Sequence, residues 1–173
     1  MNLIIKNIIR LILILFIQIF ILNKIPPLHQ LVVPYFYFVF IFWLPFRTTR
    51  TMVLFSGFVV GLLIDMFYKT PGLHTAAAVL IGYLRPFIIN LLMPKEATEW
   101  GNEEPNRFSM GSVPYATYII ILTILHNGYL ILLEWMQFGS FLYFLGKLLA
   151  TSLISLLLIL ISELLVHRKT RTR

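Results

Sequence analysis

Residues 57–86 read GFVVGLLIDMFYKTPGLHTAAAVLIGYLRP, and this stretch decides the fold. It contains two apolar runs joined by the polar turn YKTPG, in which the Pro71–Gly72 dipeptide favours a reversal of the chain. Neither run shows the period-2 polar alternation of a membrane barrel strand. The stretch therefore predicts two membrane-spanning helices, over about 51–68 and 73–93, connected by a tight turn.

The composition extends this prediction to the whole chain. Of 173 residues, 59% are hydrophobic and 12% are charged, whereas soluble domains are about 45–50% apolar and about 25% charged. The sequence contains no cysteine, which excludes disulfides and thiolate metal sites. The net charge of +7 comes from basic residues at the ends of apolar runs, a pattern that orients membrane spans and does not predict nucleic-acid binding.

Apolar runs separated by proline-rich or polar breaks predict an all-α, polytopic membrane protein that forms one helical bundle over residues 1–173. The second run is the shortest, and Pro34 lies in its first turn. The first run resembles a signal peptide but is followed by NKIPPLHQ without a small-residue cleavage site, so we expect it to be retained. The six expected spans are about 5–24, 30–46, 51–68, 73–93, 114–136 and 140–166.

Lysine and arginine residues predict that both termini are cytoplasmic. With that orientation only Lys24 and Lys69 lie outside, and Arg85 and Lys147 lie within spans. The other basic residues fall in the inside segments, which is the positive-inside pattern. These residues are Lys6, Arg10, Arg47, Arg50, Lys95, Arg107, Arg168, Lys169, Arg171 and Arg173.

Two polar segments fall on the cytoplasmic side. Residues 94–114 hold four of the seven acidic residues, and they could form a docking loop for a partner or a solvated connector. The basic tail, 167–173, could bind anionic lipid or serve as a stop-transfer anchor.

Gly57, Gly61 and Asp65 are spaced four residues apart and share one helix face. Two glycines at this spacing allow close helix packing, either within the bundle or against a partner's helix. Asp65 extends the same face, and a carboxylate there should contact protein or water, because exposure of a charge to lipid is costly.

The turn and the fourth span supply further candidate packing or interface residues. Gly72 lies in the turn and brings His74 close to the end of the third span, where we expect a hydrogen bond to Asp65 or to the turn backbone. We expect no metal site there, because a second and third ligand are lacking nearby. Gly82 and Tyr83 complete the set of interface candidates.

Arg85 has two possible roles. It lies eleven residues beyond His74, about 16 Å deeper along the helix, so Asp65 is out of reach. Glu163, about 7 Å away along the membrane normal, could form an intramembrane ion pair with it. Alternatively, Arg85 extends to the headgroups without a partner.

The run FSGFVVGLLIDMFYKTPGLHTAAAVLIGYLRP, about a fifth of the chain, resembles the central signature of the rod-shape-determining protein MreD family. The resemblance implies a component of the bacterial cytoplasmic (inner) membrane that supports cell-wall elongation. It implies MreC as the first partner, with MreB, RodA and a penicillin-binding transpeptidase in the wider complex. It also implies a bundle similar to the substrate-binding component of energy-coupling-factor transporters.

The sequence bears on three classes of function: an enzyme, a transporter component and a scaffold. An enzyme is not expected, because no catalytic constellation and no phosphate-binding loop is present, and no cofactor is implied. A small-molecule-binding component of a transporter is the alternative, suggested by polar residues within spans. A non-enzymatic scaffold in contact with protein partners and membrane lipids requires only the small-residue faces and oriented termini.

Overall fold

The structure is a computed structural model that describes residues 3–24, 32–93, 103–135 and 140–167. The described residues form helices and contain no strand, which confirms the all-helical class. Five helices are long and apolar enough to cross a membrane: Ile5–Lys24, Arg50–Tyr68, Leu73–Leu92, Ser112–Glu134 and Phe141–Leu165. The elements are α1 (Leu3–Phe16) with the π-helical turn η1 (Ile17–Ile21) and the 3-10 turn η2 (Leu22–Lys24), α2 (Val39–Phe42), α3 (Arg50–Tyr68), α4 (Leu73–Leu92), α5 (Ser112–Trp135) and α6 (Phe141–His167).

The expected second helix, over 30–46, is not formed in its described part. Residues 32–38 are not helical, and α2 contains only four residues. Pro34 disfavours helix at the preceding residue, and the sequence YFYFVFIF is rich in aromatic and β-branched residues that tolerate extended backbone. We call residues 32–46 the inner segment, because its residues 35–42 are almost completely buried.

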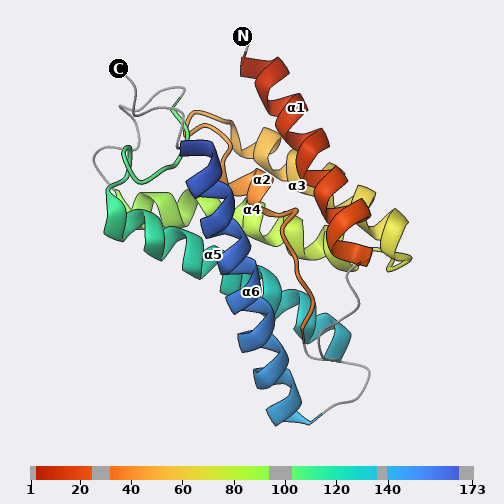
Figure 1. Ribbon diagram of the computed structural model, residues 1–173. Helices are drawn as coiled ribbons and strands as arrows, with labels where there is room; N and C mark the ends of the chain where they lie inside the picture. Colours follow the sequence, from red (N-terminus) through yellow and green to blue (C-terminus); the bar gives the residue numbers. More distant parts are fainter. Residues whose placement is uncertain (1–2, 25–31, 94–102, 136–139, 168–173) are drawn as a thin grey trace.

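The inner segment runs antiparallel to α1. Near the end of the first span, Gln18 contacts Pro34, and near its beginning Arg10 contacts Trp43. Figure 1 shows the segment returning from the end of α1 toward the side where α1 begins. Residues 32–36 are neither helical nor in a turn and cover at most about 17 Å. The turn at 37–38 and the short α2 continue the segment through the bundle without a long helix.

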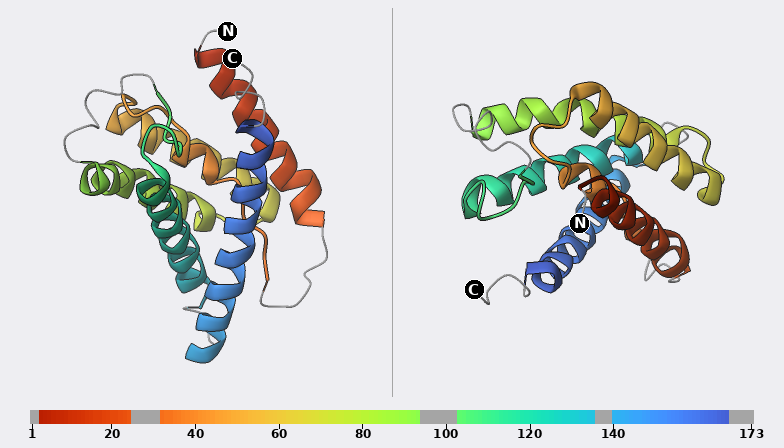
Figure 2. Two further views of the ribbon diagram at one scale, coloured as in Figure 1. Left: turned by 60° about the vertical axis from the view of Figure 1, so that its left-hand side comes forward. Right: turned by 90° about the horizontal axis from the view of Figure 1, so that it is seen from above.

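Helices α3 and α4 form an antiparallel hairpin at very short range (Figure 2). A Cβ atom on Gly57 would lie 2.8 Å from the carbonyl oxygen of Ala78, and one on Gly61 would lie 2.8 Å from the backbone nitrogen of Thr75. A Cβ atom on Gly82 would lie 3.3 Å from the carbonyl oxygen of Val53. The predicted close helix contact is confirmed, and it is made within the bundle.

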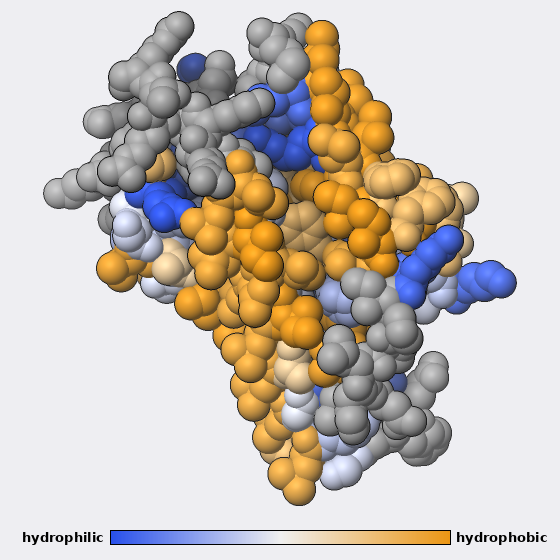
Figure 3. Space-filling model, viewed as in Figure 1, coloured by the Kyte–Doolittle hydropathy of each residue, from blue (hydrophilic) through white to orange (hydrophobic). Residues whose placement is uncertain are grey.

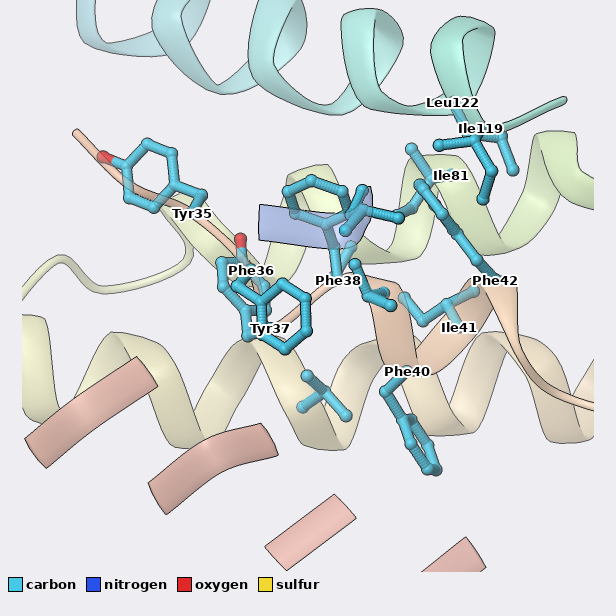
Figure 4. Packing of buried hydrophobic residues seen from close by; sticks show 14 of the residues in the cluster. Tyr35, Phe36, Tyr37, Phe38, Phe40, Ile41, Phe42, Ile81, Ile119 and Leu122 are labelled. Carbon is cyan, nitrogen blue, oxygen red and sulfur yellow. The ribbon is translucent and has the colours of Figure 1, made fainter. Parts of the chain in front are cut away.

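The inner segment forms the centre of the hydrophobic core. Figure 4 shows Phe38 and Phe42 among Ile81 of α4 and Ile119 and Leu122 of α5, all of them buried. Helices α1 and α6 lie at the periphery (Figure 2), and apolar side chains cover much of their outer surface (Figure 3). A surface of this kind suits a hydrocarbon environment.

Adding a single methyl group at the hairpin contact should destabilise the protein. In Gly61→Ala the new Cβ would meet backbone atoms of His74 and Thr75, which cannot rotate away. We expect a loss of about 1–3 kcal/mol, typical of overpacking, measured as a lower apparent melting temperature of the detergent-purified protein. Leu62→Phe adds more volume on the exposed side of the same helix and should have little effect. Equal effects of the two changes would contradict the close contact.

Candidate functional site

Gln18 satisfies the backbone of the inner segment at its beginning. Its Oε1 accepts hydrogen bonds from the backbone N–H groups of Phe36 (2.7 Å) and Tyr37 (3.2 Å). Its Nε2 donates to the carbonyl of Pro34 (3.1 Å) and to the hydroxyl of Tyr68 (2.8 Å). The side chain is fully buried in the π-helical turn η1. A non-helical backbone at this depth needs such partners, because a buried N–H or C=O group left unpaired costs about 1–3 kcal/mol.

Arg85 and Tyr118 satisfy the same segment at its other end. Arg85 donates through its guanidinium to the carbonyls of Leu44 and Pro45 and through Nε to the hydroxyl of Tyr118 (3.1 Å). Tyr118 in turn donates to the carbonyl of Phe42 at 3.0 Å. The positive charge of Arg85 therefore lies beyond the C-terminus of α2, where helix carbonyls carry no internal partner. Arg85 is 2% exposed and bonds to protein groups, so the expectation that it extends to the headgroups without a protein partner is wrong.

The predicted direct pair between Arg85 and Glu163 is also corrected. Arg85 pairs with no carboxylate among the described residues, and Glu163 instead accepts a hydrogen bond from the hydroxyl of Tyr115. Tyr115 stacks on Tyr118, with ring centroids 6.4 Å apart. Two tyrosines of α5 thus stand between the arginine of α4 and the glutamate of α6.

Asp65 holds the tip of the α3–α4 hairpin. Its Oδ1 accepts from the backbone N–H of His74 (2.9 Å) and from the Thr70 hydroxyl (3.1 Å), and its Oδ2 accepts from the backbone N–H (2.9 Å) and hydroxyl (2.6 Å) of Thr75. A carboxylate here caps the first turn of α4, where unpaired N–H groups and the helix dipole favour negative charge. His74 binds Asp65 through its backbone N–H, whereas the bond expected from its imidazole to Asp65 or to the turn backbone is replaced by a contact of Nδ1 with Tyr37. Gly72 precedes this turn with a φ of 86°, a conformation suited to glycine.

The His74 side chain belongs to a buried polar chain that crosses the bundle. The hydroxyl of Tyr37 contacts Nδ1 of His74 (3.0 Å) and Nε2 of His126 (2.7 Å), and Nδ1 of His126 contacts Oδ1 of Asn127 (3.0 Å). The amide nitrogen of Asn127 donates to Ser152 (3.3 Å) and Ser155 (3.5 Å) on α6.

The hydrogen-bond geometry defines one consistent arrangement of protons in this chain. Because the amide oxygen of Asn127 accepts, His126 carries its proton on Nδ1 and accepts from Tyr37 at Nε2. Tyr37 must then accept from a protonated Nδ1 of His74. Both imidazoles are neutral in this arrangement, which suits their almost complete burial.

An ionic cluster lies near the beginning of α1. Glu104 accepts from Lys6 (2.8 Å) and Arg10 (2.7 Å), and the guanidinium of Arg10 lies 5.6 Å from the ring centre of Trp43. The backbone of Phe46 donates to the carbonyl of Glu103 at 2.9 Å. Burial opposes ionisation of Glu104, but the bonds from Arg10 and Lys6 outweigh it and lower the pKa of this carboxyl. Three segments expected on the cytoplasmic side thus meet at one end of the molecule.

The remaining candidates have structural positions of different kinds. Tyr83 is 55% exposed and packs on Phe87, so it lies on the outer surface of α4, whereas Gly57, Gly61 and Gly82 are covered by the hairpin contact. Lys147, a basic residue within a span, pairs with Glu134 of α5. In the described part of the chain, no three potential metal ligands come together. The polar groups described above hold backbone and neighbouring helices in place.

Sequence reasoning missed Gln18, Tyr37, Tyr118 and His126. Gln18 and His126 are detectable in principle, because each is a strongly polar residue within an apolar run. Tyr37 and Tyr118 carry no such signal, since tyrosine is common near span ends for anchoring.

No known protein family, no curated protein and no solved structure matches the chain.

Replacing Gln18 by leucine should destabilise the fold strongly. Gln18→Leu leaves the N–H groups of Phe36 and Tyr37 and the carbonyl of Pro34 without their partner, at about 1–3 kcal/mol for each buried group. We expect a large loss of monodisperse protein in size-exclusion chromatography. Asn23→Leu, an exposed amide close by in the first span, is the matched control and should leave the yield unchanged. A Gln18→Leu protein as stable as the control would show that the inner segment does not depend on this amide.

A charge-swap experiment separates the observed contacts of Arg85 from the expected ion pair. Arg85→Glu should reduce the folded fraction, because it removes donors from buried carbonyls and introduces a charge near them. Glu163→Arg combined with it should restore nothing, since the two side chains have different partners. The folded fraction of each variant is measured by fluorescence-detected chromatography. Recovery in the double variant would favour direct pairing.

Proposed function

We propose that the chain is a non-enzymatic scaffold of the bacterial cytoplasmic (inner) membrane. In this proposal it belongs to the cell-wall elongation machinery and acts on cell shape and peptidoglycan synthesis by binding other proteins. The resemblance of residues 55–86 to the MreD signature supports this function. It also suggests MreC as the first partner, with MreB, RodA and a penicillin-binding transpeptidase in the wider assembly.

The observation that carries the scaffold proposal is the filled centre of the bundle. A small-molecule carrier needs internal space at membrane depth, and here that position is occupied by the side chains of residues 35–42, which are 0–6% exposed. The intramembrane polar side chains Gln18, Asp65 and Arg85 contact the protein's own backbone. The chain therefore offers partners its outer apolar surfaces and its charged inner end.

The alternative is a small-molecule-binding component of a transporter, and one observation favours it. The chain of His74, Tyr37, His126 and Asn127 is a buried polar cluster of the kind that could form part of a binding site after a rearrangement of the inner segment. The similarity of the resembled family to energy-coupling-factor components points in the same direction.

Affinity purification distinguishes the two functions. We expect the tagged protein, extracted from its own bacterium in mild detergent, to recover elongation proteins in mass spectrometry, whereas an unrelated six-span protein with the same tag does not. A stoichiometric metabolite without a protein partner would favour the carrier. Tyr37→Phe sharpens the result, because it changes the buried polar chain and should reduce metabolite recovery only in the carrier case.

We also propose six passages through the membrane with both termini in the cytoplasm, counting the inner segment as one passage. The basic residues of the inside segments support this topology. Since the chain has no cysteine, single cysteines at Glu103 and at Thr70 provide a clean test with an impermeant maleimide on intact cells. We expect labelling at Thr70 alone. Labelling of the cysteine at position 103 alone would indicate the opposite topology, with both termini outside.

A further inference from the structure

A small pocket with two arginines in its walls lies between the loop after α2, the first turn of α3 and the second half of α4. It has a volume of about 210 Å³, and its walls include Phe46, Thr48, Arg50, Arg85, Pro86 and Asn90. Pockets for drug-sized ligands measure about 300–1,000 Å³. This pocket therefore suits a single compact group, and its two arginines specify that the group is an anion.

No carboxylate among the described residues forms a salt bridge with either arginine of this pocket. The hydrogen-bond partners of Arg85 are two backbone carbonyls and a tyrosine hydroxyl, all of which are neutral. Of the described carboxylates near this end, Glu104 pairs with Lys6 and Arg10, and Glu163 accepts from Tyr115. Glu103 is exposed and contacts the pocket wall through its backbone carbonyl, which accepts from Phe46.

Arg50 occupies a position that disfavours a cation. It is the first residue of α3, and the first turn of this helix contains no acidic residue. The N-terminal end of a helix carries partial positive charge and favours anions. Arg50 is held over the ring of Phe87, 5.4 Å from the ring centre, in the wall of the pocket. Bound negative charge would stabilise both the arginine and the helix end.

An apolar groove beside the pocket indicates where the rest of the ligand lies. This groove, about 460 Å³, is lined by Ile8, Leu11, Phe40 and Met52, and Thr48 is a wall of both the groove and the pocket. Asn7 also lines the groove, and its buried Oδ1 has no hydrogen-bond partner among the described residues. Arg47 also lines the groove, and a free inorganic anion would leave the apolar walls of the groove uncovered.

We propose that the pocket and the groove together bind an anionic phospholipid. The phosphate lies near Arg50, Arg85 and Thr48, and an acyl chain follows the groove between α1 and α3. The position fits the inner leaflet, because residues 47–50 belong to the segments with basic residues on the proposed cytoplasmic side. This inference does not depend on the scaffold proposal.

Native mass spectrometry of the detergent-purified protein tests the site. The probes are dioleoyl-phosphatidylglycerol, dioleoyl-phosphatidylcholine and inorganic phosphate. We expect phosphatidylglycerol to bind more tightly than phosphatidylcholine. Arg50→Gln should weaken its binding about fivefold, the contribution of one basic residue to binding an anionic lipid. Arg107→Gln, which removes a charge in a different groove near Glu163, is the matched control and should have no effect.

Three results would overturn the proposal. Equal binding of the two lipids would exclude recognition of negative charge. Equal weakening by Arg50→Gln and Arg107→Gln would indicate a general surface effect without a site. Binding of inorganic phosphate that depends on Arg50, without competition from phosphatidylglycerol, would identify a free phosphate as the ligand. If Arg50→Gln is not folded, Thr48→Val is measured in its place, and unchanged lipid binding in that variant would contradict the site.

Discussion

The buried backbone of residues 32–46 imposes the constraint on which the rest of the structure depends. A helix satisfies its own N–H and C=O groups, whereas an extended segment at membrane depth has to find partners elsewhere. Here the partners are side chains of the surrounding helices: Gln18 at the beginning of the segment and Tyr118, Arg85 and Arg10 toward its end. These bonds fix the positions of α1, α4 and α5 around one central segment.

The same constraint explains why polar residues persist in so apolar a chain. A polar residue within a span is by default a candidate for function, but Gln18, Asp65 and Arg85 each bind backbone groups that would otherwise be unpaired. The carboxylate of Asp65 caps α4, and the guanidinium of Arg85 lies beyond the end of α2. The hydrogen bonds of these side chains are used in folding. The charge of Arg85 is the exception, because its hydrogen-bond partners are neutral and it also lines the pocket for which we propose a phosphate.

Sequence reasoning recovered the elements that depend on local patterns. The α3–α4 hairpin, its glycine contact and the turn at Pro71–Gly72 follow from spacing and turn chemistry, and five long apolar runs form helices. The prediction of a helix over 30–46 was wrong, because hydropathy measures burial and does not distinguish burial in lipid from burial in protein. The prediction that Arg85 pairs with Glu163 was wrong for a related reason. Depth along the membrane normal placed Glu163 within reach, but the lateral position of α5, which inserts Tyr115 and Tyr118, is a property of the assembled bundle.

Substitutions of interior residues and of exposed residues differ in what they can reveal about function. Substitution of an intramembrane polar residue removes both its own contact and the support of the inner segment, so loss of function alone cannot separate binding from folding. Outer residues are different, because Arg50 and Tyr83 are exposed and lie away from the core. The buried chain from His74 to Ser155 is intermediate, since it connects the tip of the hairpin to α6 without holding the inner segment's backbone. A change there would alter the coupling between two helices while leaving the central backbone bonds in place, and it is therefore the interior position from which a functional effect can be separated from unfolding.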